Sequence, residues 1–287
     1  MTFLFPDINL SANENRVRLA GIALAIMGLG FAIESMKQRE TEDEHHYYDL
    51  ANTLVGGVAF LNNAARMMDH WYHNPEKKIE IACGVLSLGV LTAQIVLTGL
   101  SASSSVALPV VIPVLLTCVN SLLGAGLNWE SANSLKEAIQ NNWARIASGT
   151  LSVGGCSTSM VNYFQNNKSD NTPTPLFYAS GSLSNGAKAL EAWARLRDIL
   201  FLHGDETSFA NKVFAGGNFA TVAIGSLVSG LAAFKVLSNV PLVFAAVMNL
   251  LHYFVYQIAQ WAPKKAGEAA ATEGQPFVSQ VPASLNT

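Results

Sequence analysis

The sequence is poor in charge. Asp, Glu, Lys and Arg make up only 13% of its 287 residues, whereas a soluble globular chain carries roughly 25%. Half of the residues are hydrophobic, and the charges are clustered, so that long stretches contain none. The formal net charge of −3 gives no basic surface of the kind that nucleic-acid-binding proteins present. This composition argues against a nucleic-acid partner and favours an integral membrane protein.

Motifs that carry chemistry are also scarce. The three cysteines, Cys83, Cys118 and Cys156, are odd in number and lie singly in apolar segments, which is typical of small buried hydrophobes rather than of a disulfide framework or metal site. There is no phosphate-binding glycine loop, and no nucleophile–histidine set with motif support. We therefore expect no enzyme activity, no cofactor and no metal.

The start of the chain has no basic region typical of a cleavable signal peptide, so the first apolar segment would act as a signal anchor.

What the sequence does contain is a long-range repeat. The stretch Leu54–Asp69 returns 129 residues later as Leu183–Asp198, with Leu, Gly, Leu, Ala, Arg and Asp at the same places. The residues after Asn15 similarly match those after Asn142, and a proline and a tryptophan twenty residues apart occur in both halves. We interpret this as a tandem duplication, which fixes the architecture before other features are considered.

Eight segments are apolar enough to be predicted as membrane helices of about 20 residues. They are residues 17–35, 50–68, 79–100, 106–128, 144–164, 175–196, 213–234 and 241–261. The sixth carries Lys188 and Glu191, and it is retained because its repeat partner is a plausible span. The predicted fold is therefore an all-α integral membrane protein made of two parallel four-helix units.

The predicted organisation has four parts: a leader over residues 1–15, membrane repeats over 16–141 and 142–262, and a disordered tail over 263–287. With both termini in the cytoplasm, twelve Lys and Arg residues fall on the inner side and four on the outer side, as the positive-inside rule requires. The sequence does not identify which membrane is spanned. A lipid bilayer is the expected surrounding, and a second copy or another membrane protein is a possible partner.

Polar residues in the apolar segments are the candidate site, because they are costly in lipid. In the repeat alignment, Asn120 matches His252 and Thr117 matches Asn249. If the fourth and eighth segments line the axis between the repeats, these four residues would form a substrate pathway there, with Gln94 as a further polar group in the third segment. The structural alternative, hydrogen bonding between helices, is the more economical interpretation of the same residues.

Charged pairs spaced three apart form a second group of candidates. Arg66 and Asp69 recur as Arg195 and Asp198 at the predicted inner ends of their segments, and Lys188 and Glu191 share one helix face. Each pair can form a bridge on its own helix. For the two Arg–Asp pairs the functional hypothesis is a gate at the inner end, and the structural alternative is anchoring at the membrane surface. For Lys188 and Glu191 the structural alternative is a tolerated neutral ion pair.

The residues 40–49 combine four acids before two histidines with a final aspartate. Such a cluster could bind a divalent metal, but we expect a solvated outer loop and no metal site there.

Three classes of function then remain. The one we favour is a transporter or channel for a small solute or ion, with its site between the repeats. The second is a membrane-inserted interaction protein such as a secreted bacterial effector, suggested by the Ala/Ser/Thr/Glu-dotted tail. The third is an intramembrane enzyme.

Overall fold

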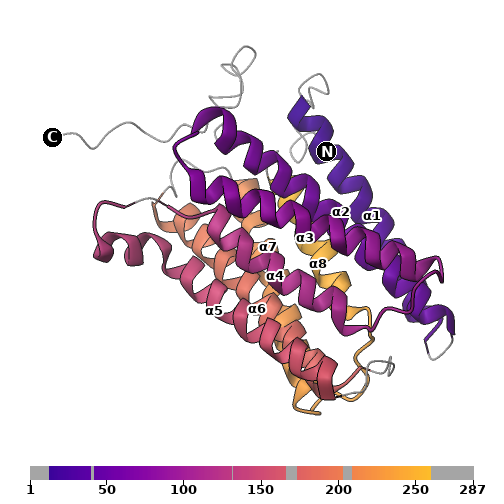
Figure 1. The fold of residues 1–287 in the computed structure, drawn as a ribbon. Helices are drawn as coiled ribbons and strands as arrows, with labels where there is room; N and C mark the ends of the chain where they lie inside the picture. The colour runs from indigo at the N-terminus through magenta and orange to yellow at the C-terminus, as the bar shows by residue number, and fades with distance from the viewer. Residues whose placement is uncertain (1–12, 40–41, 131, 166–172, 203–208, 260–287) are drawn as a thin grey trace.

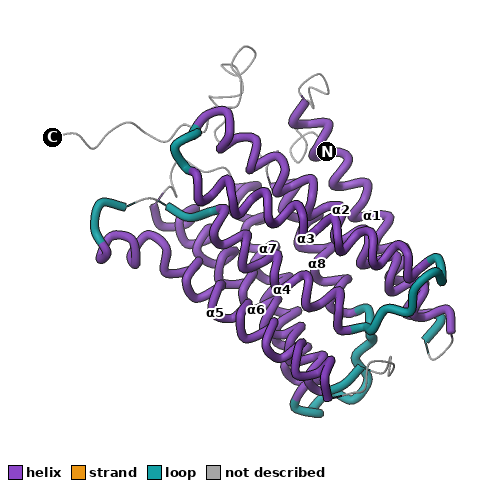
Figure 2. Tube along the Cα trace, in the orientation of Figure 1, coloured by secondary structure: helices purple, strands orange, loops and turns teal. Residues whose placement is uncertain are grey.

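The computed structural model describes residues 13–39, 42–130, 132–165, 173–202 and 209–259, and within them every regular element is a helix. The long helices run side by side (Figures 1 and 2). They are α1 (Asn13–Lys37), α2 (Glu42–His73), α3 (Lys78–Ala102), α4 (Val111–Leu127), α5 (Leu135–Gln165), α6 (Pro175–Arg197), α7 (Phe209–Ala233) and α8 (Phe244–Ala259), with a π-helical turn, η1 (Asp198–Leu202), after α6.

The all-α prediction is confirmed, and each predicted segment overlaps one helix. Two local expectations were wrong. Residues 42–49 are not a loop but the first turns of α2, because Ser35 of α1 and Ser101 of α3 donate hydrogen bonds to Glu44 and Asp49 there. Residues 106–110 precede α4 rather than belong to it, as the fixed backbone angle and missing N–H of Pro109 favour. The predicted leader and tail lie outside the described residues, except for residues 13–15 at the start of α1.

The helices form two rings. Each odd-numbered helix packs against two even-numbered ones: α1 against α2 and α8, α3 against α2 and α4, α5 against α4 and α6, and α7 against α6 and α8. The even-numbered helices contact their neighbours in the order α2, α4, α6, α8 and back to α2. Among the described residues, no Cα atoms of the diagonal pairs α2–α6 and α4–α8 come within 8 Å of each other. The even-numbered helices therefore form an inner ring around an axis.

Individual contacts recur at matched places in the two halves. The Tyr48 hydroxyl of α2 donates to the carbonyl of Val110 at 2.9 Å, and the Tyr178 hydroxyl of α6 donates to the carbonyl of Val240 at 2.6 Å. Both bonds tie an inner helix to the residues just before the next inner helix.

The C-terminal turns of α3 and α7 also match. Each ends at a residue with φ of 58°, Ser104 in one half and Lys235 in the other. In both turns the amide after this residue bonds back to a carbonyl five residues earlier, and the residue itself bonds to one three earlier. This is the left-handed termination by which many helices satisfy their last carbonyl groups.

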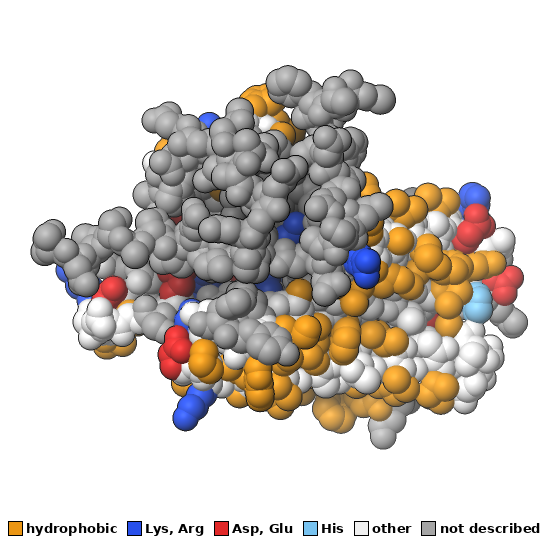
Figure 3. Space-filling model, turned by 90° about the horizontal axis from the view of Figure 1, so that it is seen from above, with side chains coloured by type: hydrophobic (Ala, Val, Ile, Leu, Met, Phe, Trp, Pro, Cys, Tyr) orange, Lys and Arg blue, Asp and Glu red, His pale blue; other side chains and the backbone are white. Residues whose placement is uncertain are grey.

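The surface of the bundle is unusually apolar. Large apolar side chains on the odd-numbered helices are exposed, including Ile26, Val85, Val153 and Leu227 at 51–62%. Figure 3 shows apolar side chains across one side of the molecule, with charged side chains at its two ends. Three helices, over Arg16–Lys37, Lys78–Ala102 and Phe209–Ala233, are long and apolar enough to cross a membrane. Monomeric soluble proteins rarely expose such an area, so the chain is suited to association with a membrane.

The outer helices meet the inner ring through small residues spaced alternately three and four apart. On α1 these buried residues are Gly21, Ala25, Gly28, Ala32 and Ser35, and on α5 they are Ser148, Ser152, Gly155, Ser159 and Asn162. Small side chains allow close helix approach where dispersion and hydrogen bonds, rather than expulsion of water, drive association.

Two of the close approaches join the two halves. A Cβ at Gly28 would lie 2.6 Å from the side chain of Leu250 in α8, and a Cβ at Gly155 would lie 2.7 Å from the sulfur of Cys118 in α4. The α1–α8 and α4–α5 contacts thus depend on a glycine at the same place in each half.

We predict that Gly28→Leu destabilises the bundle by about 1–3 kcal/mol through overpacking against Leu250. Gly30→Leu on the same helix is the matched control, because nothing lies within 4 Å of a Cβ there and both changes gain the same helix propensity. Unfolding in detergent micelles would measure both. Equal stability of the two variants would contradict the close packing of α1 on α8.

Candidate functional site

A polar cavity of about 550 Å³ lies inside the inner ring. All four inner helices contribute to its wall, and the start of α5 completes its outer part. At one end the wall consists of partly exposed residues near the end of α4, the start of α5 and the end of α6, among them Glu130, Gln140 and Arg197. This end is the mouth of the cavity. It coincides with the side that the sequence predicts to be cytoplasmic.

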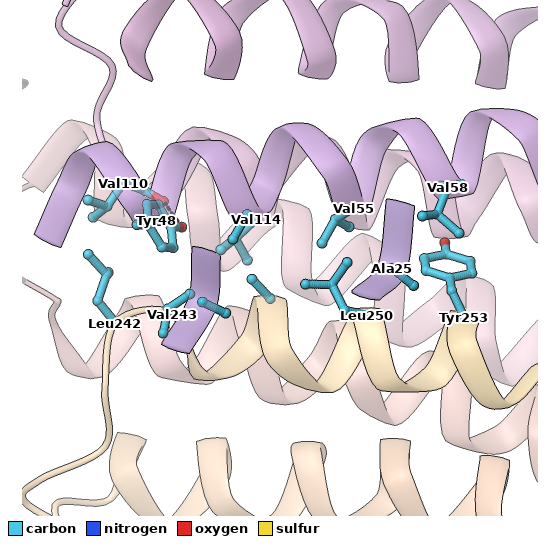
Figure 4. Packing of buried hydrophobic residues seen from close by; sticks show 14 of the residues in the cluster. Ala25, Tyr48, Val55, Val58, Val110, Val114, Leu242, Val243, Leu250 and Tyr253 are labelled. Carbon is cyan, nitrogen blue, oxygen red and sulfur yellow. Dashed lines mark hydrogen bonds between the residues drawn. The ribbon is translucent and has the colours of Figure 1, made fainter. Parts of the chain in front are cut away.

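The axis is closed at the opposite end by an apolar cluster. Tyr48, Val110, Val114, Leu242 and Val243 are buried together where α4 and α8 begin. Figure 4 shows these side chains between α2 and α8, with Leu250 and Tyr253 further along α8. The inner ring is therefore dry in one half and polar in the other, and we call the apolar cluster the plug.

The two repeat-related arginines meet at one tyrosine. Arg66 of α2 donates a hydrogen bond to the hydroxyl of Tyr256 in α8 and another, of 2.6 Å, to the amide oxygen of Asn128. The guanidinium carbons of Arg66 and Arg195 lie 5.4 and 5.0 Å from the centre of the Tyr256 ring, within the range of a cation–π interaction. Both halves thus contribute a guanidinium group to the same point of the cavity wall.

Deeper in the cavity, Lys188 and Glu191 bond to other helices rather than to each other. The Lys188 ammonium donates to the amide oxygen of Asn249 and lies 5.5 Å from the centre of the Tyr253 ring. Glu191 accepts a hydrogen bond of 2.7 Å from Ser148 of α5. These contacts explain how α6 holds two charged residues in the bundle: each finds a polar partner on a neighbouring helix, as buried charges require.

A three-residue network fixes Asn120. Its amide oxygen accepts hydrogen bonds from Ser87 of α3 at 2.6 Å and Asn63 of α2 at 3.1 Å, and Asn63 also donates to Ser87 at 2.7 Å. His252 lines the same cavity and stacks on Tyr256 with ring centres 6.3 Å apart. The Nδ1 atom of His252 is buried and has no hydrogen-bond partner among the described residues.

The remaining candidates lie at different places. Thr117 bonds to the carbonyl of Pro113 on its own helix, and Gln94 bonds to the carbonyl of Asn52 between α3 and α2. Neither residue lines the cavity. Asp198 pairs with the adjacent Arg197 at 2.6 Å, and the side chain of Asp69 lies outside the described residues. His46, one of the two histidines of the acidic segment, contacts the carbonyl of Ala102 with its Nδ1 at 2.6 Å.

Three wall residues were missed by sequence reasoning about the site. Tyr256 lies one helical turn after His252, but it matches Gly124 in the repeat alignment, so the repeat gives no reason to select it. The repeat gives no reason to select Tyr253 either. Asn218 is a polar residue of the seventh predicted segment, and nothing in the sequence links it to the axis. All three line the cavity, which only the arrangement of the inner ring reveals.

Comparison of the chain with protein-family models, with curated proteins and with solved structures finds no significant match. The functional argument therefore depends on the chemistry of the cavity.

We predict that Asn120→Ala lowers stability by about 1 kcal/mol, because Ser87 and Asn63 lose a shared acceptor; bonds of this kind average about 0.6 kcal/mol in membrane bundles. Asn62→Ala is the control, since Asn62 makes only a 3.4 Å bond to Asn63. Unfolding of both variants in micelles measures the difference. An equal effect of the two substitutions would show that the network contributes nothing.

Proposed function

We propose that the chain is a polytopic membrane protein that passes a small hydrophilic solute or ion through the axis of its inner ring. The observation that carries this proposal is the polar cavity enclosed by four helices within a bundle whose exterior is apolar. Membrane proteins place polar and ionisable residues towards a bundle interior or a water-filled pathway, and such residues commonly mark the route of a substrate.

In this proposal all eight helices cross the bilayer, although only three meet the length and hydropathy criteria. The arrangement of the rings supports the larger number. The three are α1, α3 and α7, which belong to the outer ring and would face lipid. The inner helices α2 and α6 face other helices and the cavity, so polar residues lower their hydropathy without exposing those residues to lipid.

We also propose that the bundle is a duplicated four-helix unit. The matched tyrosine bonds, the matched helix endings and the matched glycine contacts support a common origin of the halves. In duplicated transporters, substrate sites lie at the interface between the repeats, and access alternates by movement of one unit against the other. The mouth at one end of the cavity and the plug at the other support a state that is open towards one side.

The test is access of water to the cavity. In a background with Cys83, Cys118 and Cys156 replaced by alanine, single cysteines at Asn120 and His252 would be treated with a hydrophilic thiol reagent. Membranes must be oriented with the cytoplasmic face outward, because the mouth is on that side in the predicted topology. A cysteine at Val153, on the outer face of α5 and 51% exposed, is the lipid-facing control.

We expect both axial positions to be labelled and the Val153 position to remain unlabelled. Labelling of Val153 as well would mean that the outer ring faces water and would contradict the membrane arrangement. If neither axial position reacts while Gln140→Cys at the mouth does, the axis is solid. The bundle would then be better explained as a membrane-inserted interaction protein.

A further inference from the structure

The charges of the cavity are distributed unevenly along its length. Near the mouth, Arg145 pairs with Glu130 at 2.7 Å and Arg197 pairs with Asp198 at 2.6 Å, so this part is balanced. Further in, the wall carries the basic residues Arg66, Lys188 and Arg195 and one acidic residue, Glu191. The inner part of the cavity therefore has an excess of positive charge.

The hydrogen bonds that Arg66 and Lys188 make do not balance that excess. Arg66 bonds to an amide and a phenol, and Lys188 bonds to an amide, while the carboxylate of Glu191 accepts from the hydroxyl of Ser148. Neutral partners satisfy hydrogen-bonding geometry but do not cancel charge. Because the electrostatic cost of like charges grows as water is excluded, an anion in the cavity would be strongly favoured over a cation.

The basic groups are also spaced along one direction. Lys188 and Arg195 are seven residues apart on α6, two helical turns or about 10 Å on the same face. Arg66 and Arg195 both approach the ring of Tyr256, with their guanidinium carbons 5.4 and 5.0 Å from its centre. Planar guanidinium groups match the geometry of carboxylate and phosphate oxygens, and a second charge deeper in the cavity can hold the remainder of a solute.

Two buried polar atoms on the wall add further bonding capacity. Asn218 is 5% exposed and its Oδ1 has no partner among the described residues, as is also true of Nδ1 of His252. Buried polar atoms are usually satisfied. The Asn218 Oδ1 only accepts hydrogen bonds, so it can bind a donor group of the solute or ordered water, but not the oxyanion itself. A volume of about 550 Å³ falls within the usual range for small-molecule sites.

We propose that the cavity binds and selects a small organic anion, with Arg66 and Arg195 holding a carboxylate or phosphate group and Lys188 providing the inner positive charge. This proposal rests on the proposed function, because it names the class of solute for the same axial pathway. The shared chemistry is the oxyanion, and the experiment separates carboxylate from phosphate.

The experiment measures charge selectivity at Ala192, which lines the cavity on α6 between Lys188 and Arg195. In the cysteine-free background, Ala192→Cys would be modified by an anionic sulfonatoethyl and by a cationic trimethylammonioethyl methanethiosulfonate. Gln140→Cys at the mouth corrects for the intrinsic rates of the two reagents. We expect the corrected ratio of anionic to cationic rates to be at least about tenfold, from Coulomb interactions at this distance.

Substitution of the basic residues tests their role. Arg66→Gln and Arg195→Gln should each reduce the ratio at least about threefold, while Arg66→Lys, which keeps the charge, should retain most of it. Lys78→Gln is the matched control, because Lys78 is an exposed residue at the mouth end and does not line the cavity. A monodisperse elution profile of each variant confirms that it is folded.

Protection of the same cysteine identifies the solute class. Succinate and inorganic phosphate are the probes for carboxylate and phosphate, and choline is the cationic control. Slower labelling with either anion and not with choline would support the proposal. Equal rates for the two reagents, with no protection by either anion, would overturn it and leave the water-filled pathway intact. No labelling at Ala192, Asn120 or His252 would instead contradict the pathway itself.

Discussion

The architecture depends on close contact between the small-residue faces of the outer helices and the inner ring. Gly28 and Gly155 bring α1 onto α8 and α5 onto α4, and these two contacts join the halves of the chain. Once the outer helices are seated in this way, their large apolar side chains point outward and the inner helices are shielded. The polar cavity exists because this shielding lets four helices carry residues that a lipid-facing helix could not.

The same constraint explains why the two ends of the inner ring differ. At the plug, valines, a leucine and the Tyr48 ring fill the axis, and the tyrosine hydroxyls close it further by bonding to the residues that precede α4 and α8. At the other end, Arg66, Lys188 and Glu191 replace apolar contacts with hydrogen bonds between helices. The cavity and the charged residues therefore occur together at this end.

Much of the fold could be predicted from sequence because hydropathy and the repeat are local or pairwise signals. These signals predicted the helices, including α6 with its Lys188, and they identified Arg66 and Arg195 as candidate site residues. The sequence could not place these residues relative to each other. Asn120 and His252 were expected to face each other across the axis between the repeats, and both line the cavity, from the diagonal helices α4 and α8. Gln94 was grouped with them by polarity alone, and it lies instead between α3 and α2.

The two halves differ most where their residues face the axis. Under the proposed duplication, Ala59 corresponds to Lys188, Asn62 to Glu191, Asn120 to His252 and Gly124 to Tyr256. The framework contacts at Gly28, Tyr48 and Ser104, by contrast, have equivalents at Gly155, Tyr178 and Lys235. A purely structural bundle gains nothing from placing a lysine, a glutamate and a histidine on the axis of one half, since each requires a buried partner. A solute with a charged end and a different remainder does require an asymmetric site, and the second half of the chain supplies that asymmetry.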